Sequence, residues 1–243
     1  MHTTVPKALN LTTLIRQRLD PEPLAEVVLL PPFISVWPVQ QLLLGDPRIE
    51  VGAQDCHWET AGAFTGQVSA QMLRGSARYV LVGHSERRHL FGDTDRIVRQ
   101  KLDAVLAAEL IPLFAVGETA EERRAGRTDS VLRDQLRSGL LGLAPEALRG
   151  CAIAYEPVWA IGTGQSAELA DIAETVAQVR SVLDELEPGA GSQVRVLYGG
   201  SVTAKSAAAI LGLGEVDGAL VGGASLDPDE FCAIVAAVGP AAG

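Results

Sequence analysis

The sequence has no long apolar segment and few cysteines, and both absences narrow the kind of protein it encodes. No apolar run approaches the roughly 18 residues that a membrane-spanning helix needs. Residues 1–4 lack the basic start and apolar core of a secretory signal peptide. The three cysteines, Cys56, Cys151 and Cys232, show neither the spacing of a metal site nor a disulfide framework. We therefore expect a protein of the reducing cytoplasm with no membrane partner.

Positive charge is also scarce. The chain carries 20 Lys and Arg against 30 Asp and Glu, which gives a formal net charge of -10. This balance argues against a nucleic-acid partner, because phosphate backbones are bound through Lys and Arg. It also repels anionic small molecules at long range. Any phosphate site must therefore rely on local backbone amides or on a local cation.

The 243 residues contain no low-complexity linker, and we expect one domain over residues 1–243, since α/β barrels of this size are routinely single domains. Short apolar runs alternate with longer amphipathic segments, which predicts parallel strands joined by helical crossovers. Residues 167–186, for example, place apolar side chains at helical spacing. The seven apolar runs are residues 26–30, 49–54, 79–83, 111–116, 152–155, 194–198 and 218–221.

Two architectures fit this alternation: an open doubly wound sheet and a closed (β/α)8 barrel. No Gly-x-Gly-x-x-Gly turn follows the first run, so the best signature of the open dinucleotide-binding sheet is missing. Polar residues or glycines instead follow most of the runs at their C-terminal ends, where a barrel enzyme keeps its active site. We therefore predict the α/β barrel. These residues are Gln54, His84, Ser85, Glu86, Glu118, Glu156, Ser201, Gly222 and Gly223.

The stretch of residues 151–164 combines a carboxylate with the composition of a mobile lid. Its apolar run ends at Glu156, and Pro157 then prevents further strand pairing. Trp159 supplies a bulky anchor, and glycines follow as a flexible exit. Considered alone, the stretch fits an ordinary surface turn with a solvated carboxylate equally well.

His84 follows the third run, within Gly83-His84-Ser85-Glu86-Arg87-Arg88. If a helix begins there, the positive end of its dipole should lower the pKa of His84 and keep the imidazole neutral. A neutral imidazole can donate a hydrogen bond to a carbonyl oxygen. A histidine that merely caps its own loop is the alternative, but the neighbouring Glu86 and the strand end favour a functional role.

Two glycine-rich turns, residues 198–202 and 221–224, follow the last two runs. Glycines let backbone N–H groups approach an anion closely, and the last loops of a barrel are its usual phosphate site. Ser201 adds a hydroxyl donor. Plain turn chemistry is the alternative, because Gly-Gly is common between a strand and a helix.

A long loop, residues 55–66, follows the second run and carries Trp58 and Phe64. Exposed aromatic side chains are costly unless something covers them. Either a partner subunit or the protein's own barrel could do so, and the sequence leaves both open.

With these motifs assembled, the chain resembles the triosephosphate isomerase family from its first residue to Leu226 and beyond. No single block is specific, but together and in the family's order they are highly specific. The blocks are residues 52–55 (Gly-Ala-Gln-Asp), 62–66 (Gly-Ala-Phe-Thr-Gly), 83–88, 155–164, 198–202 and 216–223.

The resemblance implies a TIM barrel and an isomerase of glycolysis and gluconeogenesis, which interconverts dihydroxyacetone phosphate and D-glyceraldehyde 3-phosphate through an enediol. It makes Glu156 the base, His84 the neutral electrophile and Glu86 a supporting carboxylate; the family is itself a standard example of this base and electrophile. The implied phosphate contacts are Gly162, Ser201, Gly222 and Gly223. The implied lid, which excludes water, comprises Pro157, Val158, Trp159, Ala160, Ile161, Gly162, Thr163 and Gly164.

The resemblance implies a small phosphorylated triose as substrate and neither a metal nor an organic cofactor. It also implies a homodimer in which the loop around Thr65 docks into the partner subunit.

One departure concerns the family's first strand, which ends in an Asn-x-Lys motif. Met1 falls where the end of that motif would stand, and residues 2–19 predict the helix that follows it, with Lys7 inside that helix. We therefore expect a barrel that lacks strand 1 in this chain, with two open strand edges and no counterpart of the family's catalytic lysine. A late start, a truncated chain and true divergence all fit this departure.

Two other functions stay open. One is a non-catalytic or impaired phosphate-binding barrel that keeps Ser201, Gly222 and Gly223, and the other is an isomerase or lyase acting on another small phosphorylated sugar. The presence of both His84 and Glu156 disfavours the first, and the lid segment disfavours the second.

Overall fold

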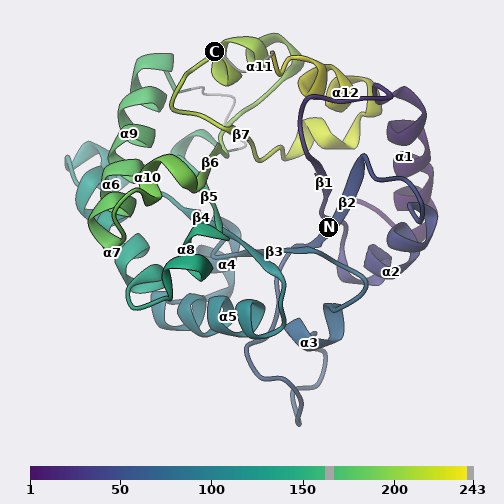
Figure 1. Ribbon diagram of the computed structural model, residues 1–243, viewed down its shortest axis with the longest axis horizontal. Coiled ribbons are helices and arrows are strands. Elements are labelled where there is room, and N and C mark those ends of the chain that lie inside the picture. The colour runs from purple at the N-terminus through teal and green to yellow at the C-terminus, as the bar shows by residue number, and fades with distance from the viewer. Residues whose placement is uncertain (162–166, 240–243) are drawn as a thin grey trace.

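The structure is a computed structural model and describes residues 1–161 and 167–239, with the strands as a central curved sheet and the helices as a ring around it (Figure 1). The strands in this part of the chain are β1 (Val27–Leu29), β2 (Ile49–Ala53), β3 (Tyr79–Val82), β4 (Ile111–Val116), β5 (Ala152–Tyr155), β6 (Arg195–Tyr198) and β7 (Gly218–Ala219). The α-helices are α1 (Val5–Arg18), α2 (Phe33–Leu42), α3 (Ala70–Leu73), α4 (Ser85–Phe91), α5 (Asp95–Ala107), α6 (Ala120–Arg124), α7 (Thr128–Leu140), α8 (Pro145–Arg149), α9 (Leu169–Leu186), α10 (Ala190–Gln193), α11 (Ala204–Leu211) and α12 (Pro228–Ala236). Two short 3₁₀ helices are η1 (Val158–Ala160) and η2 (Gly223–Leu226).

The seven strands of the described residues pair in parallel and in chain order, from β1 to β7. The sheet curls into a barrel that stays open between β1 and β7, the two ends of this order (Figure 1). A doubly wound sheet would instead reverse its strand order at a switch point. The predicted barrel with two open strand edges is therefore confirmed.

The element bounds follow the sequence pattern closely. β4 and β5 have the predicted limits, and the other strands are shorter than their apolar runs by one or two residues. The first helix begins at Val5 rather than residue 2, because Pro6 is suited to the first helical turn and Thr4 still has extended backbone angles.

Successive strand residues alternate between two apolar layers, although the strands read as continuous apolar runs. The inner layer comprises Leu81, Leu113, Ala115, Ala152 and Ala154. Phe114 and Val116, the other residues of the same β4 segment, pack in the larger layer between strands and helices. Both layers exist because parallel barrel strands are buried on both faces and side chains alternate along each strand. The same alternation sets the face that a residue just beyond a strand occupies.

The ring of helices joins its two ends through α1 and α12. Arg18 of α1 lies 3.1 Å from Asp229 of α12. The Cys232 thiol lies 3.7 Å from the Ile15 carbonyl oxygen. These contacts hold the first and last helices side by side.

At the N-terminal end of the barrel, Glu26 links strands that are not neighbours in the sheet. The Tyr79 hydroxyl donates a hydrogen bond of 2.5 Å to Glu26, and Arg195 pairs with the same carboxylate. Tyr79 begins β3, Arg195 begins β6 and Glu26 directly precedes β1. The cluster therefore ties three separate strands together at the end opposite to the predicted active site.

Among the described residues, no helix is both long and apolar enough to span a membrane.

Candidate active site

Strand alternation places the two carboxylates at the ends of β4 and β5 on different sides of the sheet. Ala152 and Ala154 belong to the inner layer, so Glu156, directly after β5, falls on the inner side. Val116 belongs to the outer layer, and Glu118, two residues later, falls on the outer side. Glu156 therefore faces the mouth of the barrel, whereas Glu118 packs behind the strands.

Glu156 is almost completely buried, with 2% of its surface exposed, and both of its carboxylate oxygens have a partner. Oε1 lies 3.0 Å from Nε2 of His84. Oε2 accepts a hydrogen bond of 3.0 Å from the backbone N–H of Ser85, the first residue of α4. A buried carboxylate needs such partners to remain charged, so α4 supplies the local support of Glu156.

His84 is the N-cap of α4, and its ring carries out two separate tasks. Nδ1 accepts a hydrogen bond of 3.2 Å from the backbone N–H of Glu86. In a neutral imidazole with Nδ1 as acceptor, the proton is on Nε2. Nε2 can thus donate toward the barrel mouth, where Glu156 now accepts.

The prediction that the helix lowers the pKa of His84 is wrong for this arrangement. Burial does lower it, but the hydrogen bond to the Glu156 carboxylate and the charges of Glu156 and Glu86 raise it, and the net pKa lies above the ordinary histidine value. The physical reason is that a carboxylate 3.0 Å away outweighs the partial charge of a short helix. Glu86 itself is exposed in the first turn of α4.

Two glycines leave the room that Glu156 occupies. A Cβ atom on Gly199, just after β6, would lie 2.8 Å from Cγ of Glu156. A Cβ atom on Gly117, just after β4, would lie 1.7 Å from the Glu156 carbonyl oxygen. Side chains at these positions would therefore displace the Glu156 side chain or backbone.

Trp159, in the described part of the predicted lid, is anchored to Glu118. Glu118 is fully buried and accepts a hydrogen bond of 2.9 Å from the indole N–H of Trp159, which lies in η1. The guanidinium of Arg123 stacks on the Trp159 ring, 4.5 Å from its centroid, and pairs with Asp171 at 2.6 Å. Burial raises the pKa of Glu118, and the hydrogen bond from Trp159 opposes that shift only in part.

The remainder of the predicted lid, Gly162, Thr163 and Gly164, lies outside the described residues. Pro157, Val158, Ala160 and Ile161 lie in and around the 3₁₀ turn η1.

Three of the four predicted phosphate contacts follow β6 and β7, and the fourth, Gly162, lies outside the described residues. Ser201 is partly exposed, and Gly222 and Gly223 are exposed at the start of η2. A Cβ atom on Gly222 or Gly223 would meet no protein atom within 4 Å, so there is open space beside this backbone. The neighbouring Gly200 is needed for a different reason, because a Cβ there would lie 2.1 Å from the Tyr198 hydroxyl oxygen.

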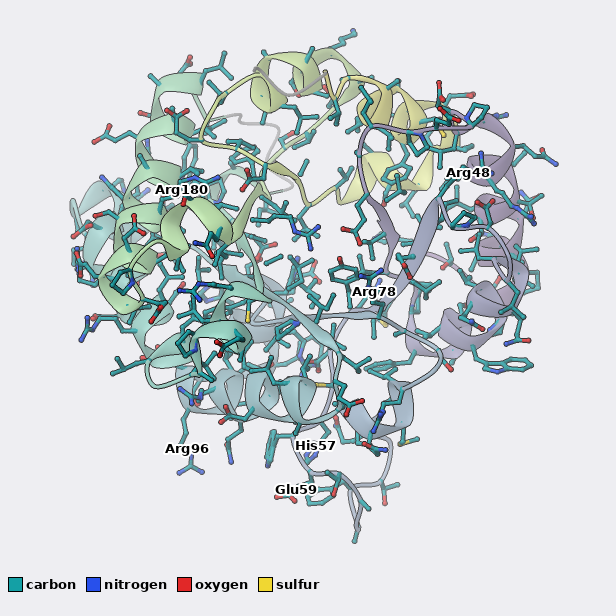
Figure 2. All side chains as sticks on the ribbon, viewed as in Figure 1. Arg48, His57, Glu59, Arg78, Arg96 and Arg180 are labelled. Atoms are coloured by element: carbon teal, nitrogen blue, oxygen red, sulfur yellow. The ribbon has the colours of Figure 1, made fainter. Side chains whose placement is uncertain are left out.

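The loop after β2 protrudes from the ring of helices, with His57 and Glu59 on it (Figures 1 and 2). The His57 ring stacks on Trp58, with the ring centroids 4.1 Å apart. Its centroid also lies 4.4 Å from that of the Phe64 ring. Its Nδ1 also accepts the Glu59 N–H at 3.0 Å. The aromatic side chains thus cover one another in part, although Phe64 remains 41% exposed.

The cations that follow His84 in α4 have partners other than Glu156. Arg88 donates to the Gly83 carbonyl oxygen at 2.8 Å and pairs with Asp95 at 2.6 Å. Arg87 pairs with Asp55 and Asp93. Lys7 lies inside α1, as the sequence predicts, and its side chain is exposed.

Sequence reasoning missed two partners. The Ser85 N–H donates to Glu156, and Glu118 accepts from Trp159. Ser85 is a backbone donor, so its side-chain type carries no signal. Glu118 could have been found from strand alternation, which separates it from Glu156.

The sequence profile described as triosephosphate isomerase matches residues 1–238. The chain belongs to the triosephosphate isomerase family. The triosephosphate isomerase of Moorella thermoacetica is 48% identical over 236 residues, which cover 97% of this chain and 94% of that protein. That of Symbiobacterium thermophilum is 46% identical over 243 residues, covering 99% of this chain and 94% of that protein.

A solved structure leads to the same family. The crystal structure of triosephosphate isomerase from Bartonella henselae superposes with a TM-score of 0.88 at 34% sequence identity, covering 98% of this chain and 95% of that one. The predictions of a TIM barrel, of this family and of a glycolytic isomerase are therefore confirmed.

Proposed function

We propose that Glu156 is the base and His84 the electrophile in the interconversion of dihydroxyacetone phosphate and D-glyceraldehyde 3-phosphate. Glu156 removes a proton from the carbon next to the carbonyl group, and His84 donates a hydrogen bond, through Nε2, to the carbonyl oxygen. The enediolate that forms receives the proton back from the Glu156 carboxyl group on the neighbouring carbon, while the hydroxyl proton passes from one substrate oxygen to the other through Nε2 of His84. No other reactant is consumed, because the reaction only moves one proton between the two carbons and one between the two oxygens.

The observation that carries this proposal is the contact between Glu156 Oε1 and His84 Nε2 at 3.0 Å. The base and the hydrogen-bond donor thus lie side by side, where they can reach adjacent atoms of one substrate, and reach is the first requirement for general acid–base catalysis. The Glu86 N–H at Nδ1 supports a donor at Nε2. A substrate between the two groups would separate the imidazole from the carboxylate charge, which favours the neutral imidazole that an electrophile needs.

Gly162, Ser201, Gly222 and Gly223 are proposed to hold the substrate phosphate. The exposure of Ser201, Gly222 and Gly223 after β6 and β7 and the open space beside Gly222 and Gly223 support this assignment. Exposed backbone N–H groups are suited to an anion in a chain with a net charge of -10. Glu86 is proposed as a supporting carboxylate, since it follows His84 in the first turn of α4.

Residues 157–164 are proposed as the lid. The anchoring of Trp159 on Glu118 gives this segment a fixed start beside the base. A lid that closes there would exclude water and limit loss of phosphate from the enediol.

A coupled isomerase assay on the purified chain tests the assignment of the base. Glu156→Ala should lower kcat by about 10³-fold, because a positioned base contributes about 10²–10⁴-fold. Binding of sn-glycerol 3-phosphate should be retained, since the phosphate contacts are elsewhere. Glu146→Ala, an exposed carboxylate of α8, is the matched control and should keep wild-type kcat. Wild-type turnover in Glu156→Ala would show that Glu156 is not the base.

We further propose a homodimer through the loop around Thr65. Phe64 is 41% exposed on this loop, and α2 carries Ile34 and Trp37 at 67% and 62% exposure, so apolar surface remains to be covered. Phe64→Glu should shift the chain from dimer to monomer in sedimentation velocity experiments. A wild-type chain that sediments as a monomer at every concentration would contradict the dimer.

A cytoplasmic location and a single domain over residues 1–243 complete the proposal. The described cysteines are free thiols, which is typical of a reducing compartment. Consecutive pairing from β1 to β7 favours one cooperative unit. Fractionation of the source cells and a single unfolding transition are the corresponding tests.

A further inference from the structure

Four charged side chains form a closed ring beside the active site, and the reaction does not use them directly. Lys101 Nζ lies 2.6 Å from Asp55 and 2.5 Å from Asp93. Arg87 lies 3.2 Å from each of the same two carboxylates. Cations and anions thus alternate around what we name the charge ring: Asp55, Arg87, Asp93 and Lys101.

Three of the four members of the charge ring are buried, which makes its balance important. The side chain of Lys101 is 3% exposed, that of Asp93 5% and that of Asp55 11%, whereas that of Arg87 is 28% exposed. A buried charge that loses its partner is strongly destabilising, whereas a balanced buried set is tolerated. The adjacent Cys56 thiol is also buried. Burial is the main cause that raises its pKa to about 12, and the charge of Asp55 adds to this.

The charge ring joins three segments of the fold. Asp55 follows β2 at the stem of the protruding loop, where the His57 N–H bonds the Val68 carbonyl oxygen at 2.7 Å. Arg87 lies in α4, and Lys101 lies in α5. Asp93 lies in the turn between those two helices, and its N–H bonds the Arg87 carbonyl oxygen at 3.1 Å.

α4 needs such an anchor. It has only 7 residues, Ser85–Phe91. Gly83 before it and Gly92 after it both have left-handed backbone angles, with φ of 79° and 76°. A short helix between two glycine turns has little of its own structure to fix its position. Yet this helix carries both contacts of Glu156, through His84 and the Ser85 N–H.

We propose that the charge ring fixes α4 against the stem of the β2 loop, and that Lys101 is thereby a positioning residue for the isomerase reaction. This inference rests on the proposed roles of Glu156 and His84. Lys101 closes the ring from α5, so that Arg87 stays between Asp55 and Asp93 and α4 keeps its place. The chemical step should depend on this placement more than substrate binding does, because none of the proposed phosphate contacts lies in α4.

The test compares three variants of the full chain. Lys101→Met should lower kcat by about 10- to 100-fold, the usual cost of a misplacement near 1 Å, with KM within about twofold of wild type. Lys101→Met/Asp55→Asn removes one charge of each sign and leaves the Arg87–Asp93 pair, so most of the lost kcat should return. Arg99→Met removes a cation from the same helix, at an exposed pair with Asp103, and should change neither constant.

Three results would overturn the proposal. The first is a folded Lys101→Met with wild-type kcat and only a lower melting temperature, which is a purely structural role. The second is a folded double variant that recovers no kcat, because the loss would then not come from the charge ring. The third is a loss of kcat that disappears at high protein concentration, because the loss would then come from subunit dissociation.

Should Lys101→Met not fold, Asp55→Asn weakens two contacts of the ring and gives the same test: lower kcat at unchanged KM supports the proposal, and unchanged kcat overturns it. Failure of the proposed function is recognised separately, as wild-type turnover in Glu156→Ala.

Discussion

Oε1 of Glu156 and Nε2 of His84 lie 3.0 Å apart, although the two residues are far apart in the chain and follow different strands. This contact raises the pKa of His84 against the opposing effect of burial. Glu156→Gln should therefore lower the pKa of His84, as measured by NMR titration of its ring C–H signals. An unchanged or higher value in the variant would mean that Glu156 does not control the charge of His84.

The same shift predicts how the stability of the protein depends on pH. Because the folded-state pKa of His84 is raised, the stabilisation from its charged form is complete below the unfolded-state pKa and is lost as the pH rises through the folded-state pKa. The difference in free energy of unfolding between wild type and Glu156→Gln should shrink across that window. Urea unfolding below and above the measured titration midpoint checks this, and a difference that grows with pH would contradict it.

Trp159→Phe should destabilise the protein. The substitution removes the N–H donor from Glu118, which is fully buried. Leaving a buried acceptor without that donor costs about 1–3 kcal/mol in the free energy of unfolding. Trp37→Phe is the control, because Trp37 is 62% exposed and such surface changes stay within about 0.5 kcal/mol. Equal stability of the two variants in urea would show that the bond to Glu118 contributes little.

Gly199→Ala should lower kcat. The added Cβ would lie 2.8 Å from Cγ of Glu156, so the proposed base must shift. Displacing a catalytic group by up to about 1 Å is expected to cost about 10- to 100-fold in kcat. Gly214→Ala is the matched control, since a Cβ there meets nothing within 4 Å. A folded Gly199→Ala with the kcat of the control would mean that Glu156 tolerates displacement.

Glu26→Gln should destabilise the protein without changing kcat, because Glu26 lies at the opposite end of the barrel from Glu156. Burial opposes ionisation of Glu26, but hydrogen bonds from Tyr79 and Arg195 win and hold its pKa below the ordinary value. Its contribution is therefore present above the unfolded-state pKa and is lost as the pH falls through the folded-state pKa. Acid titration of stability, with the exposed Glu22→Gln as control, checks this. A stability difference that persists at low pH would contradict it.

Much of the fold could be predicted from the sequence because strand and helix periods are local properties. The apolar run ending at Tyr155 predicts β5, and the alternation along it places Glu156 on the inner side. The helical spacing in residues 167–186 predicts α9, which starts only two residues later than expected. The position of His84 directly after β3 predicts that it lies at the N-terminus of α4, where it is the N-cap.

The parts that failed or were missed depend on contacts between distant segments. The pKa of His84 is set by a carboxylate from another strand, which the helix-dipole argument did not include. Lys101 has the sequence context of an ordinary helical lysine, yet it is buried between Asp55 and Asp93. Such meetings arise from the curl of the barrel and leave no periodic signal in the sequence.

The most direct test of the account is hydrogen exchange between dihydroxyacetone phosphate and deuterated water, followed by NMR. Exchange at the carbon next to the carbonyl reports proton removal itself, independently of later steps. The account predicts exchange with the wild-type chain and a rate about 10³-fold lower with Glu156→Ala, as expected for loss of a positioned base. Exchange at the wild-type rate in Glu156→Ala would contradict the central claim that Glu156 removes the proton.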